Sequence, residues 1–172
     1  CATIKTAVSK ATDDDIINIA AGTYLEHDIE IGKRLTLAGA GADNTIIDGG
    51  FDGRVFKIWM KTTISGVTVR HGRIVTNSAL IFDTGGGAII NSGELTLQDS
   101  VLHDNDTIGH GGAIFNYGEL TIDNTEILTN STDLYGGGIY NYIFGAITMT
   151  DSLIANNEAV GTFGGGIYTF QP

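Results

Sequence analysis

The sequence predicts an all-β fold, a single-stranded parallel β-helix of about six coils with a short helix over its N-terminal end. The first observation is a repeat. A Gly-Gly-Ala-Ile-x-Asn motif recurs with a period of about 25 residues, which indicates one supersecondary unit stacked on copies of itself. The second is composition, because 25 glycines against one proline in 172 residues indicate many tight turns. The third is that the segments between turns are short and β-rich. The copies lie at residues 85–91, 110–116, 135–141 and 164–169.

Residues 2–11 are expected to form the N-terminal helix. Apolar side chains recur there at helical spacing, and the lysines lie on the other side. A solenoid needs its first coil covered, and a helix laid across the open end provides that cover. The apolar residues of this helix are Ile4, Ala7, Val8 and Ala11.

The segments after the helix predict the sides of irregular coils. Each is three to seven residues long and bounded by Gly, Asp or Asn, so none can form a sheet with a core of its own. Residues 72–84 lack a pattern and are expected to form a loop. We therefore predict a single β-helix domain, 1–172, with the cap and irregular coils at 1–84 and regular repeats at 85–172. The domain is expected to be a fragment of something longer or a subunit in it. The predicted strands are 29–31, 35–37, 45–49, 55–58 and 63–69.

Each repeat is expected to form three sides of a coil, and strand parity assigns the faces. The isoleucine and the asparagine of the motif share the inward parity. Because a buried amide must be hydrogen-bonded, the asparagines are expected to bond to their copies in neighbouring coils. The glycines are expected at corners, where positive φ or close approach of coils requires them. The inward columns are Ile89, Ile114, Ile139 and Ile167; Leu95, Leu120 and Ile147; Leu97, Ile122 and Met149; Leu102, Ile127 and Ile154; and Asn91, Asn116 and Asn141.

Charge is distributed unevenly along the chain. The formal net charge is −11, yet all nine Lys and Arg residues lie at or before Arg73, so the acidic excess falls on the repeat half. A surface of this sign disfavours nucleic acid and anionic membranes as partners. No apolar run is long enough for a membrane span. The chain does not begin with Met, which suggests a processed chain, and we expect it to be secreted or held at the cell surface. The role of Cys1 is left open between a lipid anchor, an intermolecular link and a fragment boundary.

Several segments resemble known β-helix proteins. Residues 3–8 and 17–24 resemble the opening of right-handed parallel β-helix proteins of the pectate-lyase-like superfamily, and residues 31–41 and 45–49 are similar to its first full coil. The later Gly-Gly-Ala-Ile and apolar-x-x-Asn repeats are similar to those of polymorphic outer-membrane-protein passengers and other surface adhesins. This resemblance covers nearly the whole chain and implies a right-handed coil. It leaves the activity open, because the superfamily holds lyases, hydrolases, esterases, adhesins and structural fibres.

A polysaccharide lyase or hydrolase is one alternative function. For a lyase the resemblance implies acidic calcium ligands and an Arg or Lys as base, and the repeat half has no Lys or Arg. For a hydrolase it implies paired carboxylates beside a Gly-His-Gly motif. Residues 109–111 match those letters but occupy a corner of the repeat, so His110 is expected to be a solvated turn residue. An active site is expected in a cleft between the early coils and the loop at 72–84. Its candidate residues are Arg70, Arg73, Asp48 and Asp52.

No metal ligand is assigned, and calcium is the cofactor left open. Polar side chains stack on successive coils, and like charges about 4.8 Å apart repel one another. Solvent, shifted pKa values or bound calcium can relieve that repulsion. The stacks are Glu94 with Glu119, and Asp99 with Asn124 and Asp151; the triplet Asp104-Asn105-Asp106 is a further candidate.

An outward aromatic ladder is the predicted binding site. Such columns stack on sugar rings, pack against a second protein, or are covered by the chain's own loops, here residues 72–84 or Ile143-Phe144. The leading hypothesis is a non-catalytic extracellular or cell-surface scaffold for adhesion or assembly, which binds a carbohydrate or a surface protein through the ladder. A subunit that stacks end to end into an extracellular filament is the alternative. One predicted column holds Ile90, Phe115, Tyr140 and Tyr168, and the next holds Ser92, Tyr117, Tyr142 and Phe170.

Overall fold

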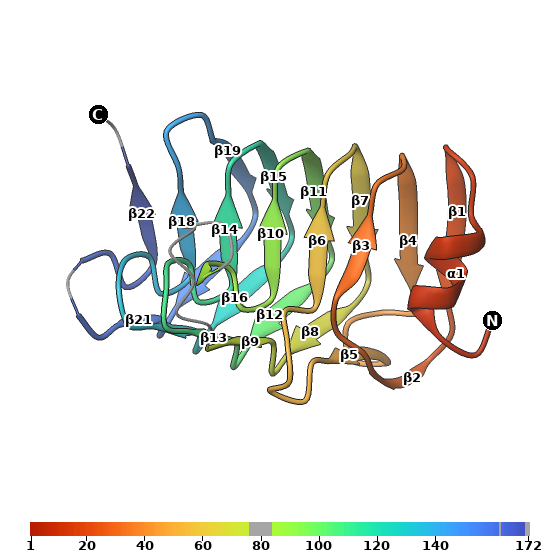
Figure 1. The fold of residues 1–172 in the computed structure, drawn as a ribbon, viewed down its shortest axis with the longest axis horizontal. Helices are drawn as coiled ribbons and strands as arrows, with labels where there is room; N and C mark the ends of the chain where they lie inside the picture. Colours follow the sequence, from red (N-terminus) through yellow and green to blue (C-terminus); the bar gives the residue numbers. More distant parts are fainter. Residues whose placement is uncertain (76–83, 162, 171–172) are drawn as a thin grey trace.

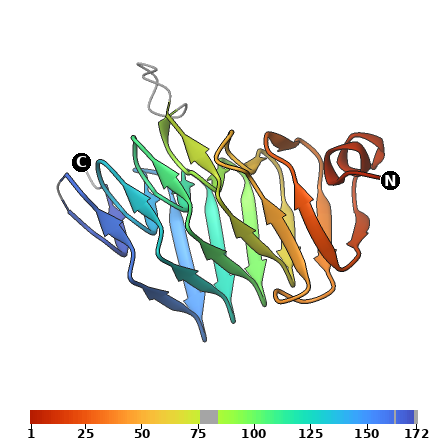
Figure 2. The same ribbon diagram turned by 90° about the horizontal axis from the view of Figure 1, so that it is seen from below.

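The protein is a stack of short parallel strands with one helix at its N-terminal end. The structure, a computed structural model, describes residues 1–75, 84–161 and 163–170. In these residues the strands lie side by side along one axis, as two perpendicular views show (Figures 1 and 2). The strand pairs between neighbouring coils are parallel. The predicted fold class, a parallel β-helix, is confirmed.

Four sheets run along the axis of this solenoid, and three of them contain six described strands, one for each coil. Sheet A comprises β1 (Asp15–Ile19), β4 (Leu35–Gly39), β7 (Thr62–Ser65), β11 (Glu94–Gln98), β15 (Glu119–Asp123) and β19 (Ala146–Thr150). Sheet B comprises β2 (Gly22–Leu25), β5 (Thr45–Asp48), β8 (Thr68–Arg70), β12 (Val101–His103), β16 (Glu126–Leu128) and β20 (Leu153–Ala155). Sheet C comprises β3 (Ile29–Ile31), β6 (Phe56–Ile58), β10 (Ile89–Asn91), β14 (Ile114–Asn116), β18 (Ile139–Asn141) and β22 (Ile167–Thr169).

Sheet D is a short fourth side that the repeat pattern does not predict. It comprises β9 (Arg73–Ile74), β13 (Asp106–Thr107), β17 (Ser131–Thr132) and β21 (Glu158–Ala159). The expectation of three sides for each coil is therefore wrong for the repeats. Two-residue strands fall below the length at which alternation of apolar and polar residues is visible in a sequence. The predicted loop at 72–84 begins with β9, and its residues 76–83 lie outside the described part of the chain.

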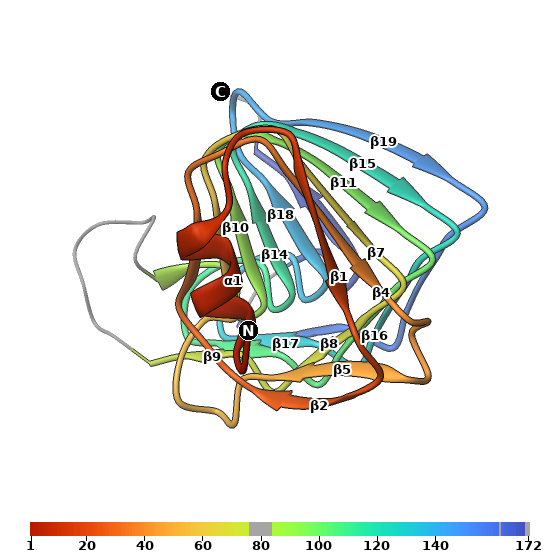
Figure 3. The same ribbon diagram turned by 90° about the vertical axis from the view of Figure 1, so that its right-hand side faces the viewer.

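The helix α1 (Ile4–Lys10) covers the N-terminal end of the stack, as the sequence predicts (Figure 3). Thr3 caps the helix, because its hydroxyl accepts a hydrogen bond from the Thr6 amide. Ile4 and Val8 are buried in the main core. At the other end of the helix, the Lys33 ammonium donates to the carbonyl of Ala11 at 2.6 Å and neutralises the partial negative charge there.

The main core is built from the predicted inward columns. Ile89, Ile114 and Ile139 are in register on sheet C, and all three are fully buried. Ile167 continues the column but is 39% exposed, because β22 belongs to the last described coil and pairs with a neighbour on one side. A residue of this column is therefore fully buried only where its coil has a neighbouring coil on each side.

Stacked asparagines stabilise the turns from inside, which confirms their predicted role. The Asn91 amide donates to Asn116 at 2.8 Å, and the Asn116 amide donates to Asn141 at 2.7 Å. The apolar-x-x-Asn step forms a second ladder. In it Asn105 donates to Asn130, and Asn130 to Asn157, both at 2.9 Å. Because these amides are buried or partly buried, each bond avoids the cost of an unpaired polar group.

The glycine triplets lie at corners, also as predicted. One glycine at the same position of each repeat has positive φ, for example +70° at Gly111 and +72° at Gly136, which a residue with a Cβ adopts only under strain. Gly85 is required for a different reason, since a Cβ there would overlap the ring of Phe115. These corners bring the turn residues that follow sheet D close to the outer surface of sheet C.

Candidate aromatic binding face

Two columns of side chains cover the outer surface of sheet C. The strand register places Ile90, Phe115, Tyr140 and Tyr168 in one line, which we call the inner column. Backbone hydrogen bonds place Ser92, Tyr117, Tyr142 and Phe170 in the next line, the outer column. The buried members of the inner column pack together as a cluster separate from the main core. The predicted parity of these residues is therefore correct.

The inner column is not an exposed surface, however. Phe115 is fully buried and Tyr140 is only 3% exposed, so neither ring can contact a partner in this structure. Corner residues cover them: the His110 ring stacks on Tyr140 with 4.4 Å between ring centroids, and Gly85 closes over Phe115. The chain's own turns thus provide a cover, which corrects the expectation that these two rings are accessible.

The outer column remains partly exposed and is ordered by stacking. Tyr117 and Tyr142 stack with 5.6 Å between centroids, and Tyr142 and Phe170 stack at 5.7 Å. Phe144, in the longer turn of this coil, meets Tyr117 edge to face at 5.5 Å and is 69% exposed. Each such ring pair adds about 0.5–1.5 kcal/mol beyond the burial of its area. Together these residues form the accessible part of the face.

Burial changes the acidity of Tyr140. Desolvation disfavours its phenolate, and neighbouring tyrosines add to the effect, which raises the pKa of Tyr140 to about 12. Tyr140 therefore stays protonated at physiological pH. Its role is to pack the inner column.

His110 is part of this aromatic cluster, and its predicted role as a solvated turn residue is wrong. Its ring stacks with both Tyr140 and Tyr135 of the next coil, and its Nδ1 atom is buried without a hydrogen-bond partner among the described residues. Burial lowers the pKa of the imidazole from its ordinary value of 6.5, because desolvation disfavours the charged form.

We expect His110 to make the protein less stable in acid. Its pKa is lower in the folded chain than in the unfolded chain, so the unfolded chain binds the proton first as the pH falls below about 6.5. Stability is thus complete above that pH and declines through the folded pKa. A His110→Phe variant keeps a flat ring and should lose less stability than the wild type on acidification, as measured by urea unfolding at neutral and mildly acidic pH. Equal losses in the two proteins would contradict this assignment.

Sequence reasoning missed three aromatic residues of this region. Trp59 is the sole tryptophan and is 47% exposed. Its backbone N–H donates to the Ile31 carbonyl, and in the next coil the Ser92 N–H donates to the Ile58 carbonyl in the same way. It therefore extends the outer column beyond Ser92, into coils whose irregular spacing hides the alignment. Tyr135 and Phe163 lie in corner turns and stack at 6.4 Å. Tyr135 could have been identified from the sequence, because it occupies in its repeat the position that His110 occupies in the preceding repeat.

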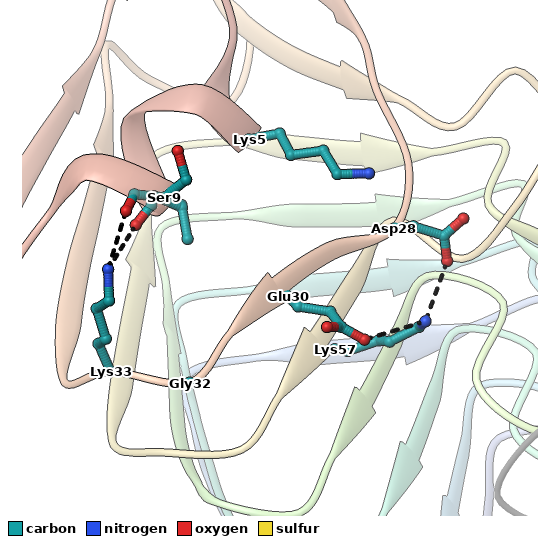
Figure 4. A pocket seen from close by; sticks show the side chains of 8 residues that line it. Lys5, Ser9, Asp28, Glu30, Gly32, Lys33 and Lys57 are labelled. Carbon is teal, nitrogen blue, oxygen red and sulfur yellow. Dashed lines mark hydrogen bonds and ion pairs between the residues drawn. The ribbon is translucent and has the colours of Figure 1, made fainter.

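A cavity of about 440 Å³ lies at the N-terminal end of the same sheet, between α1 and strands β3 and β6 (Figure 4). Two of its three lysines are already engaged. The Lys57 ammonium lies 3.4 Å from Asp28 and 3.3 Å from Glu30, and Lys33 holds the end of α1. Glu30 and Lys57 occupy the inner-column positions of the first two strands of sheet C. Charged pairs therefore replace the aromatic rings at this end of the face.

Three of the four residues proposed for an active site separate into two ion-pair clusters. Asp48 accepts hydrogen bonds from Arg70 at 2.8 Å, from His71 and from the Gly50 amide. Partial burial opposes its ionisation, but these donors outweigh that effect and hold the pKa of Asp48 below its ordinary value. Arg73 instead lies 3.2 Å from Asp106 on the next coil.

Asp52, the fourth candidate, is exposed, and its backbone N–H donates to the Gly49 carbonyl in a turn. The cleft predicted beside the loop at 72–84 falls largely on residues outside the described part of the chain. The hypothesis of a lyase or hydrolase therefore stays a prediction. What the described residues show is a carboxylate, that of Asp48, whose hydrogen bonds hold neighbouring coils together.

The carboxylates at which calcium was left open have other partners. Glu94 and Glu119 are in register, and the Lys61 ammonium lies 2.6 Å from Glu94. Asp99 accepts from the Asn124 amide at 2.6 Å. Asn105, the middle residue of the triplet at 104–106, is buried and belongs to the second asparagine ladder. Within the described ranges, no three His, Cys, Asp or Glu side chains form a group suited to a metal ion.

We therefore expect calcium to leave stability unchanged. The repulsion in each stack is already relieved by an ammonium or an amide group, so a cation has little left to neutralise. Thermal unfolding monitored by circular dichroism should have the same midpoint with excess calcium and with a chelator. A midpoint that rises with calcium and falls with the chelator would reinstate the calcium site.

These observations define the class of the molecule as a parallel β-helix with an aromatic face on one sheet. Comparison of the chain with family models, with curated proteins and with solved structures gives no match. The described part of the chain contains no helix with the length and apolar character of a membrane span.

Proposed function

We propose that the chain is a non-catalytic scaffold, secreted or held at a cell surface, that binds a partner through the exposed part of its aromatic face. The observation that supports this is the convergence of accessible rings on a regular sheet. Phe144 and Phe170 are exposed beside the half-exposed Tyr117 and Tyr142. Aromatic side chains gathered on one surface are typical of interaction sites. The similarity of the repeats to those of surface adhesins supports the same function.

The stacking of the rings favours a surface protein over a carbohydrate as the partner. Tyr142 stacks on Tyr117 on one side and on Phe170 on the other, so its ring faces are engaged within the column. A sugar ring binds through the face of an aromatic side chain, whereas ring edges and phenol groups suit a protein interface, in which tyrosine is enriched. A carbohydrate remains the second ligand class to test.

The test is a binding comparison between two double variants. Phe144→Ala with Phe170→Ala removes exposed rings from the face, and Ile16→Ala with Leu25→Ala removes exposed apolar side chains from the first coil. Labelled chains are applied to intact cells and to immobilised extracellular proteins and polysaccharides. We expect the face variant to bind at least about tenfold more weakly, a loss of about 1.4 kcal/mol, and the control to bind as the wild type does. Equal losses, or depolymerisation of a polysaccharide by the wild type, would contradict the proposal.

Self-assembly into a filament is the second candidate function. The observation that favours it is the exposure of Met149, Leu153 and Ile167 on the last described coil. The helix α1 opposes simple head-to-tail stacking, because it occupies the other end of the solenoid. Light scattering over a range of concentrations tests this candidate. A growing mass that Leu153→Lys suppresses would support assembly, and a constant monomer mass would exclude it.

A further inference from the structure

The tyrosines of the aromatic face form an unbroken series of ring contacts. The chain has six tyrosines, and five of them belong to this series. Three of the four contacts cross from one coil to the next, and the fourth joins Tyr140 and Tyr142 on the same coil. Centroid distances are 5.6 Å from Tyr117 to Tyr142, 6.2 Å from Tyr142 to Tyr140, 5.6 Å from Tyr140 to Tyr168, and 4.6 Å from Tyr168 to Tyr135.

We propose that this series is a site of oxidative cross-linking, at which dityrosine bonds join Tyr117 to Tyr142 and Tyr135 to Tyr168. The ring centroids of the two pairs lie 5.6 and 4.6 Å apart, within the 4.5–7 Å range of interacting aromatic side chains. All four side chains are half-buried, so each has an accessible edge. Each bond would connect neighbouring coils, because β14, β18 and β22 are successive strands of sheet C. The cross-links would act as covalent staples across the stack.

The reaction requires a one-electron oxidant, and a peroxidase with hydrogen peroxide supplies it. Each phenol loses one electron and one proton and becomes a phenoxyl radical. The two radicals couple through ring carbons ortho to oxygen, and the two hydrogens on those carbons shift to the oxygens as both rings regain aromaticity. One carbon–carbon bond forms, two hydrogen atoms leave the protein, and one hydrogen peroxide is reduced to two waters.

The structure also indicates which tyrosines stay unlinked. Tyr140 lies between the two pairs but is covered by His110, and burial raises its pKa, so it is shielded from the oxidant. Tyr24 is a control within the same chain. Its hydroxyl donates to the Ala20 carbonyl at 3.0 Å, and it makes no ring contact among the described residues. It should therefore lack a partner for coupling.

The experiment treats the purified full chain with peroxidase and hydrogen peroxide at low protein concentration. The readouts are dityrosine fluorescence and mass spectrometry of peptides. Cleavage after Glu and Asp separates the paired residues, whereas trypsin has no site beyond Arg73. We expect peptides 107–119 and 159–172 each to be joined to peptide 134–151 of the same chain, with two hydrogen atoms lost for each bond. Fragmentation of the joined peptides should assign the bonds to Tyr142 and Tyr135, and the cross-linked protein should have a higher denaturant midpoint. In urea the yield should fall to background, because the rings separate.

Conservative variants keep the rings and remove the phenols. Tyr142→Phe should abolish the first cross-link and retain the second, and Tyr168→Phe should do the reverse. The double variant should lose the dityrosine fluorescence and keep the wild-type circular dichroism spectrum. Coupling through Tyr24 or Tyr140, cross-links found only between chains, or equal yields in folded and urea-unfolded protein would each overturn the proposal.

Discussion

Replacement of Asn116 by alanine is expected to lower the free energy of unfolding by about 3 kcal/mol or more, because several buried polar groups lose their partner together. The Asn116 amide donates to Asn141 at 2.7 Å and to the carbonyls of Gly118 and Ala146, and its oxygen accepts from Asn91 at 2.8 Å. The alanine side chain has no polar atom that could replace any of these hydrogen bonds. Urea unfolding followed by circular dichroism measures the loss as a lower midpoint.

Asn44→Ala is the matched control for this variant. Asn44 is exposed, and its amide makes only a long bond of 3.3 Å to the Ala40 carbonyl. We expect a change within about 0.5 kcal/mol, as for most surface substitutions. If Asn116→Ala costs no more than this control, the asparagine ladder does not stabilise the stack as the structure indicates.

Phe115→Ala is expected to destabilise the chain by about 3–5 kcal/mol, the usual cost of removing a buried phenylalanine. Phe115 is fully buried beneath the corner at Gly85 and contacts Tyr140 with 5.2 Å between ring centroids. The substitution leaves a cavity between coils that glycine corners and parallel strands cannot easily close. The measurement is again the urea midpoint, with unfolding followed by the fluorescence of Trp59.

Phe144→Ala separates packing from binding on the same face. Its ring is 69% exposed, so its removal should change stability little while it weakens binding. Phe115→Ala should have the opposite effect. It should lower stability, but the folded variant should bind the partner almost as tightly as the wild type, because the buried ring makes no direct contact with it. The reverse pattern would mean that Phe115 is accessible and that the cover seen in the structure opens in solution.

Much of the candidate site could be predicted from the sequence, and the reason is strand parity. In a repeat of constant length, the residue after each motif isoleucine must point away from the core, which identified Phe115, Tyr140 and Tyr168 as outward residues. Parity says nothing about what lies above an outward side chain. The cover by His110 and Tyr135 depends on how the corner turns fold back over sheet C, and Trp59 aligns only through backbone pairing in irregular coils.

A fixed period and a two-residue alternation leave few other ways to bury the same side chains, so the sequence alone was enough to predict the parallel β-helix, the capping helix, the core columns and the asparagine ladder. The three-dimensional contacts were needed to establish which aromatic rings are accessible, why His110 has a buried nitrogen, and how Asp48, Arg70 and His71 meet. Those contacts join residues from different coils and turns. Their geometry depends on corner conformations that local sequence patterns do not specify.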